Sequence, residues 1–205
     1  MFPKHIQWGW QTQLPYHSEC CTLWQVHGNN IVRAQPSISS QADAHWSQTP
    51  NQILCVRTAD CLPILLGHSS LPWVAAIHGG WRSLTQDIIQ NTLMLAPKPL
   101  KHLWVWIGPC IHAPSFAFDQ ALAHTYFPSH YINTTDQQTT VDLLAYAKSI
   151  FNDHGVHHIR SSLLNTYQCA YLPSYRRDRT RERLYSWIKL NTSVNCTPIE
   201  ELEDD

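Results

Sequence analysis

Two histidines and one cysteine stand at three separate turns of this chain and together offer a set of metal ligands. They are His27, Cys61 and His78, and each follows a short apolar run. Imidazole nitrogen and thiolate sulfur suit zinc, and two nitrogens with one sulfur also suit copper. A structural zinc site usually has four protein ligands, whereas three leave one coordination position for water or substrate. The pattern therefore favours a catalytic metal centre.

The same three residues also fit other interpretations. In an ordinary structural one, His27 caps a turn, Cys61 packs as a small apolar side chain, and His78 is a buried, hydrogen-bonded histidine. In a third interpretation Cys61 is a nucleophile and His78 is its base, as in a cysteine hydrolase. Metal ligation and nucleophilic attack compete, because a sulfur bound to zinc is a poor free nucleophile.

Polar residues beside these ligands are candidates for catalysis and anion binding. Asp60 precedes Cys61 and would orient water, orient a ligand histidine or act as a general base, or else simply form a turn at a strand end. The turn that contains Gly79 and Gly80 precedes an expected helix, so its backbone N–H groups suit an anion such as phosphate. Arg82 would add a bidentate contact to that anion, or else remain a solvated arginine.

The elements that must position these residues are mostly short strands. Apolar runs bounded by turn residues indicate strands that are buried on both faces. Pro63 lies within one of these runs and favours an edge strand or a break there. We expect the run at 31–34 to continue or pair with the run at 23–26. The expected strands are 23–26, 31–34, 53–58, 62–67, 73–77, 103–107 and 183–190.

Three helices are expected between and after these strands. Ser83 is followed by a glutamine three residues later, which is a capping-box signature and predicts a helix start near Ser83. Either Asp119 or the Pro114-Ser115 pair is expected to open a short helix that runs through Tyr126. The clearest apolar face predicts a helix over 141–152, with Gly155 as its C-terminal stop.

Strands joined both directly and through helices predict an α+β fold, in which mixed β-sheets are covered by helices in a layered sandwich. The 205-residue chain suits a single domain with a sizeable core. We expect residues 1–22 to form a short N-terminal strand and loop and residues 23–190 to form the catalytic domain. Residues 191–205 end in acidic residues and are expected to form a mobile tail.

Composition narrows the class of partner. The formal net charge is −1, so the sequence lacks the excess of positive charge that is typical of proteins that bind nucleic acid or an anionic membrane. No apolar run has the length of a signal peptide core or a membrane span. The seven cysteines are odd in number and irregularly spaced, which is typical of free thiols rather than of a disulfide framework. We therefore expect a cytoplasmic protein with a small-molecule substrate; the sequence does not specify an oligomeric state.

Five segments in a fixed order carry a resemblance to a known family. Together they resemble the bacterial laccase-domain family, whose members are called polyphenol oxidase, peptidoglycan-editing factor or zinc-dependent purine nucleoside phosphorylase. The resemblance extends from Gln25 to about Leu190. The segments are Ala42-Asp43-Ala44, Thr58-Ala59-Asp60-Cys61-Leu62-Pro63, His78-Gly79-Gly80-Trp81-Arg82, Ile107-Gly108-Pro109-Cys110-Ile111 and Ser174-Tyr175-Arg176-Arg177-Asp178.

The resemblance implies a zinc enzyme that cleaves adenosine, inosine and methylthioadenosine with phosphate and also deaminates adenosine. Zn2+ would be held by the two histidines and the cysteine, with copper as the alternative metal. Arg57, Arg176 and Arg183 match family positions and are candidates for binding nucleoside or phosphate, although any one of them also fits a surface or ion-pair role.

Three other functions remain open. A Cys-His hydrolase would act on a peptidoglycan precursor. A copper-dependent polyphenol oxidase is disfavoured, because the sequence lacks the His-X-His pairs that hold several coppers in multicopper oxidases. A non-enzymatic metal-binding or partner-binding protein is the third, because fewer residues precede His27, the first of the ligand histidines, than in the family.

Some positions depart from the family pattern or fit a structural role. Gly79 stands where alanine is usual, and Ser83 stands where glycine is usual. These departures leave the metal ligands intact, but they weaken the inference from the family to a particular substrate. Asp43 and Asp142 match family positions and are expected to be structural caps. Cys110 is expected to pack in the pocket wall rather than to bind metal.

Overall fold

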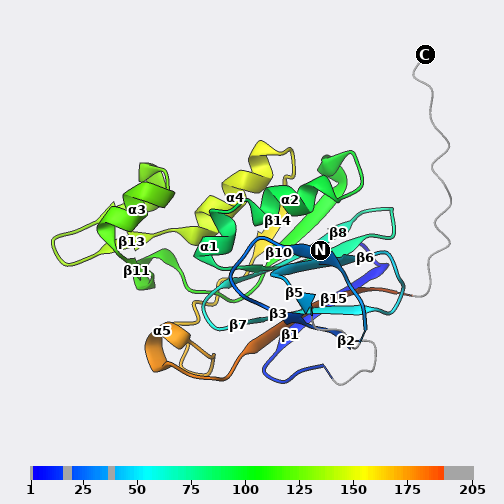
Figure 1. The fold of residues 1–205 in the computed structure, drawn as a ribbon, viewed down its shortest axis with the longest axis horizontal. Coiled ribbons are helices and arrows are strands. Elements are labelled where there is room, and N and C mark those ends of the chain that lie inside the picture. The colour runs from blue at the N-terminus through cyan, green and yellow to red at the C-terminus, as the bar shows by residue number, and fades with distance from the viewer. Residues whose placement is uncertain (1, 16–19, 37–39, 192–205) are drawn as a thin grey trace, which may run out of the picture.

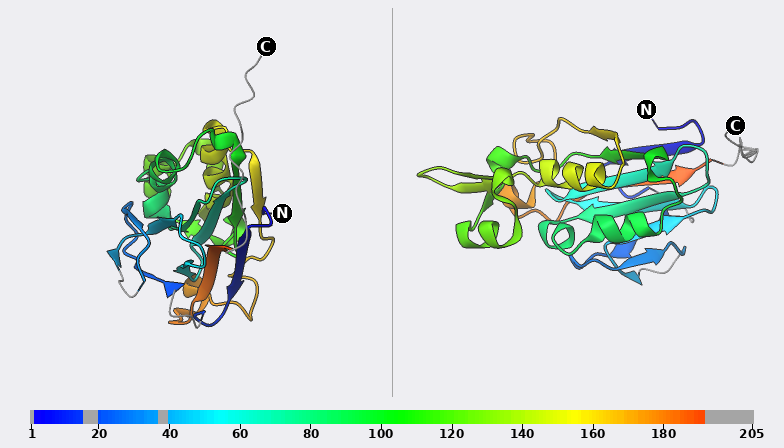
Figure 2. Two further views of the ribbon diagram at one scale, coloured as in Figure 1. Left: turned by 90° about the vertical axis from the view of Figure 1, so that its right-hand side faces the viewer. Right: turned by 90° about the horizontal axis from the view of Figure 1, so that it is seen from above.

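The structure is a computed structural model that describes residues 2–15, 20–36 and 40–191. Its strands form two stacked sheets, with helices on the outer side of the larger one (Figures 1 and 2). The fold class expected from the sequence is confirmed. The expected acidic tail lies outside the described residues except for Asn191. None of the helices in the described part of the chain is long and apolar enough to cross a membrane.

The larger sheet has six strands in the order β14-β10-β8-β9-β6-β4. It is mixed, because β10 pairs with β14 and β4 pairs with β6 in parallel, whereas the pairs β8–β9, β8–β10 and β6–β9 are antiparallel. Its strands are β4 (Ile31–Arg33), β6 (Ala44–Ser47), β8 (Leu62–His68), β9 (Val74–Gly79), β10 (Leu103–Ile107) and β14 (His158–Ser161).

The second sheet has four strands in the order β1-β15-β7-β2, and two smaller sheets lie beside the main pair. The four strands are β1 (Ile6–Gln11), β2 (Cys20–Cys21), β7 (Ile53–Thr58) and β15 (Leu184–Leu190). The smaller sheets are formed by β3 (Leu23–Trp24) with β5 (Ser40–Gln41), and by β11 (Ala117–Phe118), β13 (Thr139–Val141) and β12 (Ile132–Thr134).

The helices are short and lie mainly over the six-stranded sheet. Figure 1 shows α1, α2 and α4 on its outer side, while α3 and the β11–β13–β12 sheet project from one end. The helices are α1 (Trp81–Leu84), α2 (Ile88–Met94), α3 (Gln120–Tyr126), α4 (Leu143–Asp153) and α5 (Tyr175–Asp178), with 3-10 turns at Leu100–His102, Ala113–Ser115 and Ser129–Tyr131.

Two apolar layers hold this arrangement together. Along β8, Leu62 and Ile64 belong to the layer between the six-stranded sheet and the helices, whereas Leu65 belongs to the layer between the two sheets. All seven residues of β8 are buried. A strand covered on both faces needs apolar residues at every position rather than an alternating pattern. This explains why the sequence around the candidate ligands is so uniformly apolar.

The expected strands 53–58, 62–67, 103–107 and 183–190 are confirmed to within a residue. The proposed edge position of Pro63 is wrong, because β8 lies between β9 and β10 inside the six-stranded sheet. Pro63 is tolerated as the second residue of β8, directly after the turn at Cys61, and its carbonyl accepts a hydrogen bond from the N–H of Gly108 at 2.9 Å. The strand 31–34 does not pair with 23–26, since β4 pairs with β6 and β3 pairs with β5.

The helix expected to start at Ser83 starts two residues earlier, at Trp81. Its N-cap is Gly80, which provides no side-chain cap, and the hydroxyl of Ser83 is buried without a hydrogen-bond partner among the described residues. Asp87, with a φ of 64°, separates α1 from α2. The strand before α1 also extends through Gly79, further than expected. The capping-box motif failed because Ser83 faces the core rather than the helix N-terminus.

The other two helices follow the expected signals more closely. Asp119 is the N-cap of α3, and its carboxylate accepts the N–H of Leu122 at 2.9 Å. Asp142 is confirmed as a structural cap, because it accepts the N–H of Ala145 at 2.8 Å at the start of α4. Gly155 follows that helix with a φ of 75°, as expected for a glycine stop.

Candidate metal centre

His27, Cys61 and His78 converge in space although they are far apart in the chain. One ligand atom from each lies within 4.8 Å of the other two. His27 Nε2 is 3.9 Å from Cys61 Sγ, and the two imidazole rings meet edge to face with centroids 4.8 Å apart. Among the described residues, no other group of three or more histidine, cysteine or acidic side chains comes close enough together to hold a metal ion.

The sheet register brings the three ligands together. Leu62 pairs with Gly79 and Pro63 pairs with His78 across β8 and β9, so the Cys61 turn lies beside the end of β9. His27 approaches from the loop between β3 and β4. Gly80 leaves the space that these side chains occupy, because a Cβ there would lie 2.9 Å from His27 Cδ2 and 3.5 Å from Cys61 Sγ.

The donor set and its spacing fit a metal ion of the zinc type. Two nitrogens and one sulfur around tetrahedral zinc lie roughly 3.5 Å from one another, and the three atoms here need only small side-chain movements to reach that spacing. His78 is buried, Cys61 is half-buried and His27 is exposed, so the cluster has an open side. An open side is what a catalytic metal needs and a structural metal lacks.

Asp43 is the residue whose role the sequence did not reveal. It was expected to be a structural cap, and it does accept the N–H groups of Val26, His27 and Gly28 at 3.1, 2.9 and 2.8 Å. In addition its Oδ1 accepts the Nδ1–H of His78 at 2.7 Å. An acid between two alanines just before a buried strand needs a partner, and this pattern is the signal that could have indicated one.

Electrostatics within the cluster favour a thiolate. Burial raises the pKa of the Cys61 thiol, but the charge of His78 and hydrogen bonds with His27 and His78 outweigh it and lower the pKa to about 6. Burial lowers the pKa of His78, but the Cys61 thiolate and Asp43 raise it to about 9. Burial also opposes ionisation of Asp43, while its bonds to His78 and to backbone N–H groups lower its pKa overall. Without a metal, these interactions favour the thiolate form of Cys61 and the protonated form of His78.

Asp60 lies beside Cys61 but turns its carboxylate toward other segments. Its Oδ1 accepts the hydroxyl of Thr166 at 2.7 Å, and its Oδ2 accepts the backbone N–H of Arg176 at 2.6 Å. Its carbonyl accepts the N–H of Ile111 at 2.9 Å, and its φ is 91°. Asp60 therefore fixes the loop around Thr166 and the start of α5 to the turn that carries Cys61. It is largely buried, with one lone pair on each oxygen still available.

The four arginines that were expected to bind substrate or phosphate differ in how many hydrogen bonds their guanidinium groups donate to the protein. Arg57 donates to the carbonyl of Leu23 at 3.0 Å. Arg176 donates to the carbonyl of Ala117 and lies 4.9 Å from the ring of Phe116.

Arg183 donates to two backbone carbonyls near α5, those of Thr180 and Glu182. Arg82 is exposed on α1, and its guanidinium carbon lies 4.4 Å from the centroid of its neighbour Trp81. Of the four, Arg82 is the one whose guanidinium has no hydrogen-bond acceptor in the described part of the chain.

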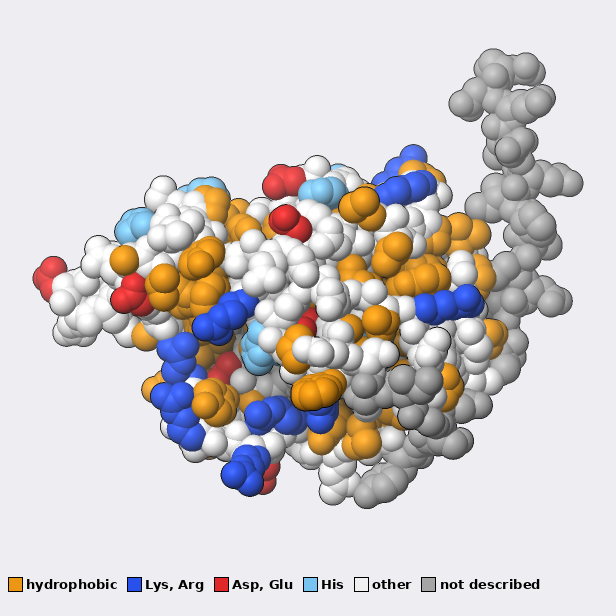
Figure 3. Space-filling view, viewed as in Figure 1, with side chains coloured by type: hydrophobic (Ala, Val, Ile, Leu, Met, Phe, Trp, Pro, Cys, Tyr) orange, Lys and Arg blue, Asp and Glu red, His pale blue; other side chains and the backbone are white. Residues whose placement is uncertain are grey.

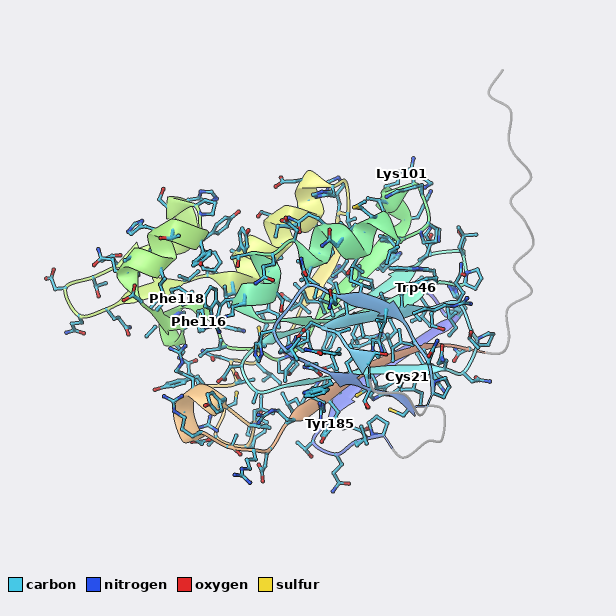
Figure 4. The ribbon with its side chains drawn as sticks, in the orientation of Figure 1. Cys21, Trp46, Lys101, Phe116, Phe118 and Tyr185 are labelled. Carbon is cyan, nitrogen blue, oxygen red and sulfur yellow. The ribbon has the colours of Figure 1, made fainter. Side chains whose placement is uncertain are left out.

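Basic side chains gather on one part of the surface. Figure 3 shows Lys and Arg side chains gathered on the face between α1 and α5. Phe116 and Phe118 lie between α3 and α5 at the same end of the molecule (Figure 4). Arg177, which was not singled out from the sequence, donates to the carbonyls of Thr166, Tyr167, Cys169 and Leu172 and so shapes the adjoining loop.

The two glycines before Arg82 have clear packing reasons. Gly79 belongs to β9, and a Cβ there would lie 3.0 Å from the carbonyl oxygen of Leu62. Gly80 accommodates His27 and Cys61, as described above. Their proposed contribution to anion binding stays a prediction. Cys110 is fully buried in the core layer beneath the helices and is not one of the clustered ligands.

Comparisons with known proteins bear on the family and on the fold. Residues 8–191 match the family described as multi-copper polyphenol oxidoreductase laccase. A Shigella flexneri protein named purine nucleoside phosphorylase YfiH is 32% identical over 178 residues, which cover 82% of this chain and 72% of that protein. A Pseudomonas aeruginosa protein that is also named purine nucleoside phosphorylase is 31% identical over 182 residues, covering 84% and 75%.

Solved structures show the same fold. The crystal structure of a Neisseria meningitidis protein superimposes with a TM-score of 0.79 at 29% identity, covering 84% of this chain and 75% of the other. YlmD from Geobacillus stearothermophilus superimposes with a TM-score of 0.77 at 23% identity, covering 85% and 74%. With the match to the family model extending over nearly the whole described chain, we conclude that this protein belongs to the laccase-like multi-copper polyphenol oxidoreductase family.

Proposed function

We propose that this protein is a zinc-dependent purine nucleoside phosphorylase that acts on adenosine, inosine and methylthioadenosine and also deaminates adenosine. The observation that carries the proposal is the convergence of His27, Cys61 and His78 on one centre with an open side. Relatives at about 30% identity are named purine nucleoside phosphorylases, which supports the reaction class. No disulfide joins the six described cysteines, which supports a reducing compartment such as the cytoplasm.

The chain's own residues have distinct tasks in this proposal. Bound zinc would supply a Lewis acid and lower the pKa of a bound water. His27, Cys61 and His78 would hold the metal, and the exposed side of His27 leaves access for the nucleoside.

In phosphorolysis, a phosphate oxygen forms a bond to the anomeric carbon while the bond from that carbon to the purine nitrogen breaks. Arg82 would bind the phosphate, because its guanidinium is exposed and bidentate contacts suit phosphate oxygens. Asp60 would accept or orient a proton through its remaining lone pairs. Arg57, Arg176 and Arg183, together with the backbone of Gly79 and Gly80, complete the proposed substrate and phosphate contacts.

A product assay with and without phosphate tests this proposal. The protein is purified without added metal, its zinc and copper are measured, and adenosine is incubated with it in phosphate-free buffer and in buffer containing phosphate. Adenine that forms only with phosphate supports phosphorolysis, and inosine supports deamination. Formation of neither product by zinc-loaded protein would overturn the proposal.

The low pKa of Cys61 also supports a second candidate, a Cys-His hydrolase acting on a peptidoglycan precursor. A thiolate beside an imidazole is the usual arrangement of a nucleophilic cysteine. Hydrolysis of a peptide or amide by metal-free protein, lost in Cys61→Ala, would favour this candidate. The copper-dependent oxidation of phenols implied by the family's description is a further alternative, which an oxygen-consumption assay with copper-loaded protein would test.

A further inference from the structure

We propose that Asp43 is a positioning residue that aligns two of the three metal ligands at once and thereby sets the affinity of the centre for its metal. This inference rests on the metal centre proposed above. Asp43 stands just before β6, is completely buried and contacts both histidine segments. Cys61, the third ligand, is held by its own turn between β7 and β8.

Asp43 fixes the His78 segment through both its side chain and its backbone. Its Oδ1 accepts the Nδ1–H of His78 at 2.7 Å, which leaves Nε2 of that ring for the cluster. Its backbone carbonyl accepts the backbone N–H of His78, also at 2.7 Å. A carboxylate behind a ligand imidazole fixes the ring orientation and raises its strength as a donor. Loss of the carboxylate would leave the buried His78 Nδ1–H without its acceptor.

The same carboxylate also fixes the first ligand segment. Val26, His27 and Gly28 donate their three consecutive backbone N–H groups to its two oxygens. His27 has a φ of 61°, in the left-handed region. That conformation is unfavourable for a residue with a side chain. Three hydrogen bonds to a charged acceptor stabilise it and determine where the His27 ring can point.

A shared carboxylate couples the two histidines to each other. Binding of a metal to both rings restrains the turn at 26–28, and an ordered turn presents His27 for binding, so the two events favour each other. Without Asp43 the metal would have to order the turn and the His78 ring by itself. Outer partners of this kind typically change metal affinity by about 10- to 100-fold.

Two variants and a matched control test the role of Asp43. Asp43→Asn keeps the size of the side chain but replaces one acceptor oxygen with an NH2 group that faces N–H donors. Asp43→Glu keeps the charge and tests whether a carboxylate in a slightly different place restores function. Asp142→Asn removes a carboxylate that accepts one backbone N–H at the start of α4 and is not part of the ligand cluster. Circular dichroism and thermal unfolding establish that each variant is folded.

The readouts are zinc affinity and local hydrogen exchange. Zinc binding is measured by competition with a chromophoric chelator, and amide exchange is followed in peptides covering residues 25–29 with and without zinc. We expect Asp43→Asn to bind zinc 10- to 100-fold more weakly, to exchange faster at residues 26–28 without metal, and to show less protection when zinc is added. Asp43→Glu should recover part of the affinity, and Asp142→Asn should match the wild type in both measurements.

Zinc affinity of folded Asp43→Asn within twofold of the wild type would overturn the inference, as would unchanged exchange at residues 26–28. If Asp142→Asn weakened zinc binding as much as Asp43→Asn does, the effect would be one of global stability and the inference would also fail. Absence of zinc binding by the wild type would instead overturn the metal centre, while the exchange comparison would still decide whether Asp43 orders the turn.

Discussion

Gly80 lies against the imidazole of His27 so closely that no side chain fits between them. A Cβ at position 80 would lie 2.9 Å from His27 Cδ2 and 3.5 Å from Cys61 Sγ. The backbone of Gly80 has a φ of −72° and a ψ of 159°, which any residue can adopt. The glycine is therefore required for the space that it leaves beside two ligands and not for its conformational freedom.

Gly80→Ala should disturb metal binding more than folding. The added methyl group would push His27 away from Cys61, so we expect zinc affinity to fall at least tenfold while the protein stays folded. Gly28→Ala is the matched control, because a Cβ there would make only ordinary contacts of 3.6 and 3.7 Å. Chelator competition and thermal unfolding measure the two effects. Equal zinc affinities for the Gly80 and Gly28 variants would contradict the steric argument.

Cys61→Ala should lose the metal together with any metal-dependent activity. Thiolate is the strongest donor of the set for zinc, and its removal leaves two imidazoles, one of them exposed. Cys169→Ala removes a thiol of similar, intermediate exposure outside the ligand cluster and serves as the control. Zinc content by atomic emission and product formation from adenosine are the measurements. Stoichiometric zinc in Cys61→Ala would refute the ligand assignment.

Much of this fold was predictable because its buried strands leave a strong local signal. The run at 62–67 is apolar at every position, and the structure covers β8 on both faces. Turn and cap chemistry was less reliable. Ser83 has the right spacing for a cap, but the chain enters the helix at Gly80, so that the hydroxyl of Ser83 points into the core. A local motif cannot report which face of a short helix the rest of the fold will bury.

In the site, too, features that depend on neighbouring residues were predictable from the sequence, whereas contacts between distant segments were not. Three ligands at three turns could be identified from residue type and from their neighbours. Asp43 could not be assigned to His78, because 35 residues separate the two and only the pairing of β6 with β9 brings them together. The link from Asp60 to Thr166 spans 106 residues and depends on the packing of a loop without regular structure. Sequence spacing carries no information about such contacts.

Arg82→Ala should separate phosphorolysis from deamination. If Arg82 binds the phosphate, the KM for phosphate should rise at least tenfold, while inosine formation, which needs no phosphate, should stay within about twofold of the wild type. Arg33→Ala is the control, because Arg33 also lies over a tryptophan ring, that of Trp46, at 5.5 Å, but on β4. An unchanged KM for phosphate in Arg82→Ala would remove this residue from the proposed phosphate site.

Thr166→Val should destabilise the protein, because it removes a hydrogen bond to the carboxylate of Asp60. The buried Thr166 hydroxyl donates to Asp60 Oδ1 at 2.7 Å, and valine has the same shape without the donor. Leaving a buried carboxylate oxygen without its donor costs about 1–3 kcal/mol. Urea unfolding should show this loss, whereas Thr125→Val, which removes an exposed hydroxyl that donates within α3, should change the free energy of unfolding by less than about 0.5 kcal/mol.

A double-mutant cycle with Asp60→Asn identifies the source of the loss. If the two side chains act together, the free energies of the single variants will not add in the double variant, since the second substitution removes a contact already lost. Additive effects would show that Thr166 stabilises the protein independently of Asp60.

His45 should make the protein sensitive to mild acid. Its side chain is buried, and the described part of the chain offers neither ring nitrogen a hydrogen-bond partner. Burial lowers the pKa of His45 to about 3. In the unfolded chain the imidazole binds a proton below about pH 6.5, whereas in the folded protein it stays neutral. The unfolded state therefore binds more protons in this window, and stability falls as the pH drops from about 6.5 toward 3.

His45→Leu removes this proton linkage and two buried nitrogens that lack partners. The slope of the unfolding free energy with pH should become shallower between pH 6.5 and 4.5, by up to about 1.4 kcal/mol per pH unit, while stability at pH 7.5 is retained or increased. Urea unfolding at several pH values measures the slope, with the exposed His124→Leu as the control. Equal slopes for wild type and His45→Leu would show that other groups govern acid unfolding, because a histidine that stays neutral in the folded state must contribute its full linkage in this window.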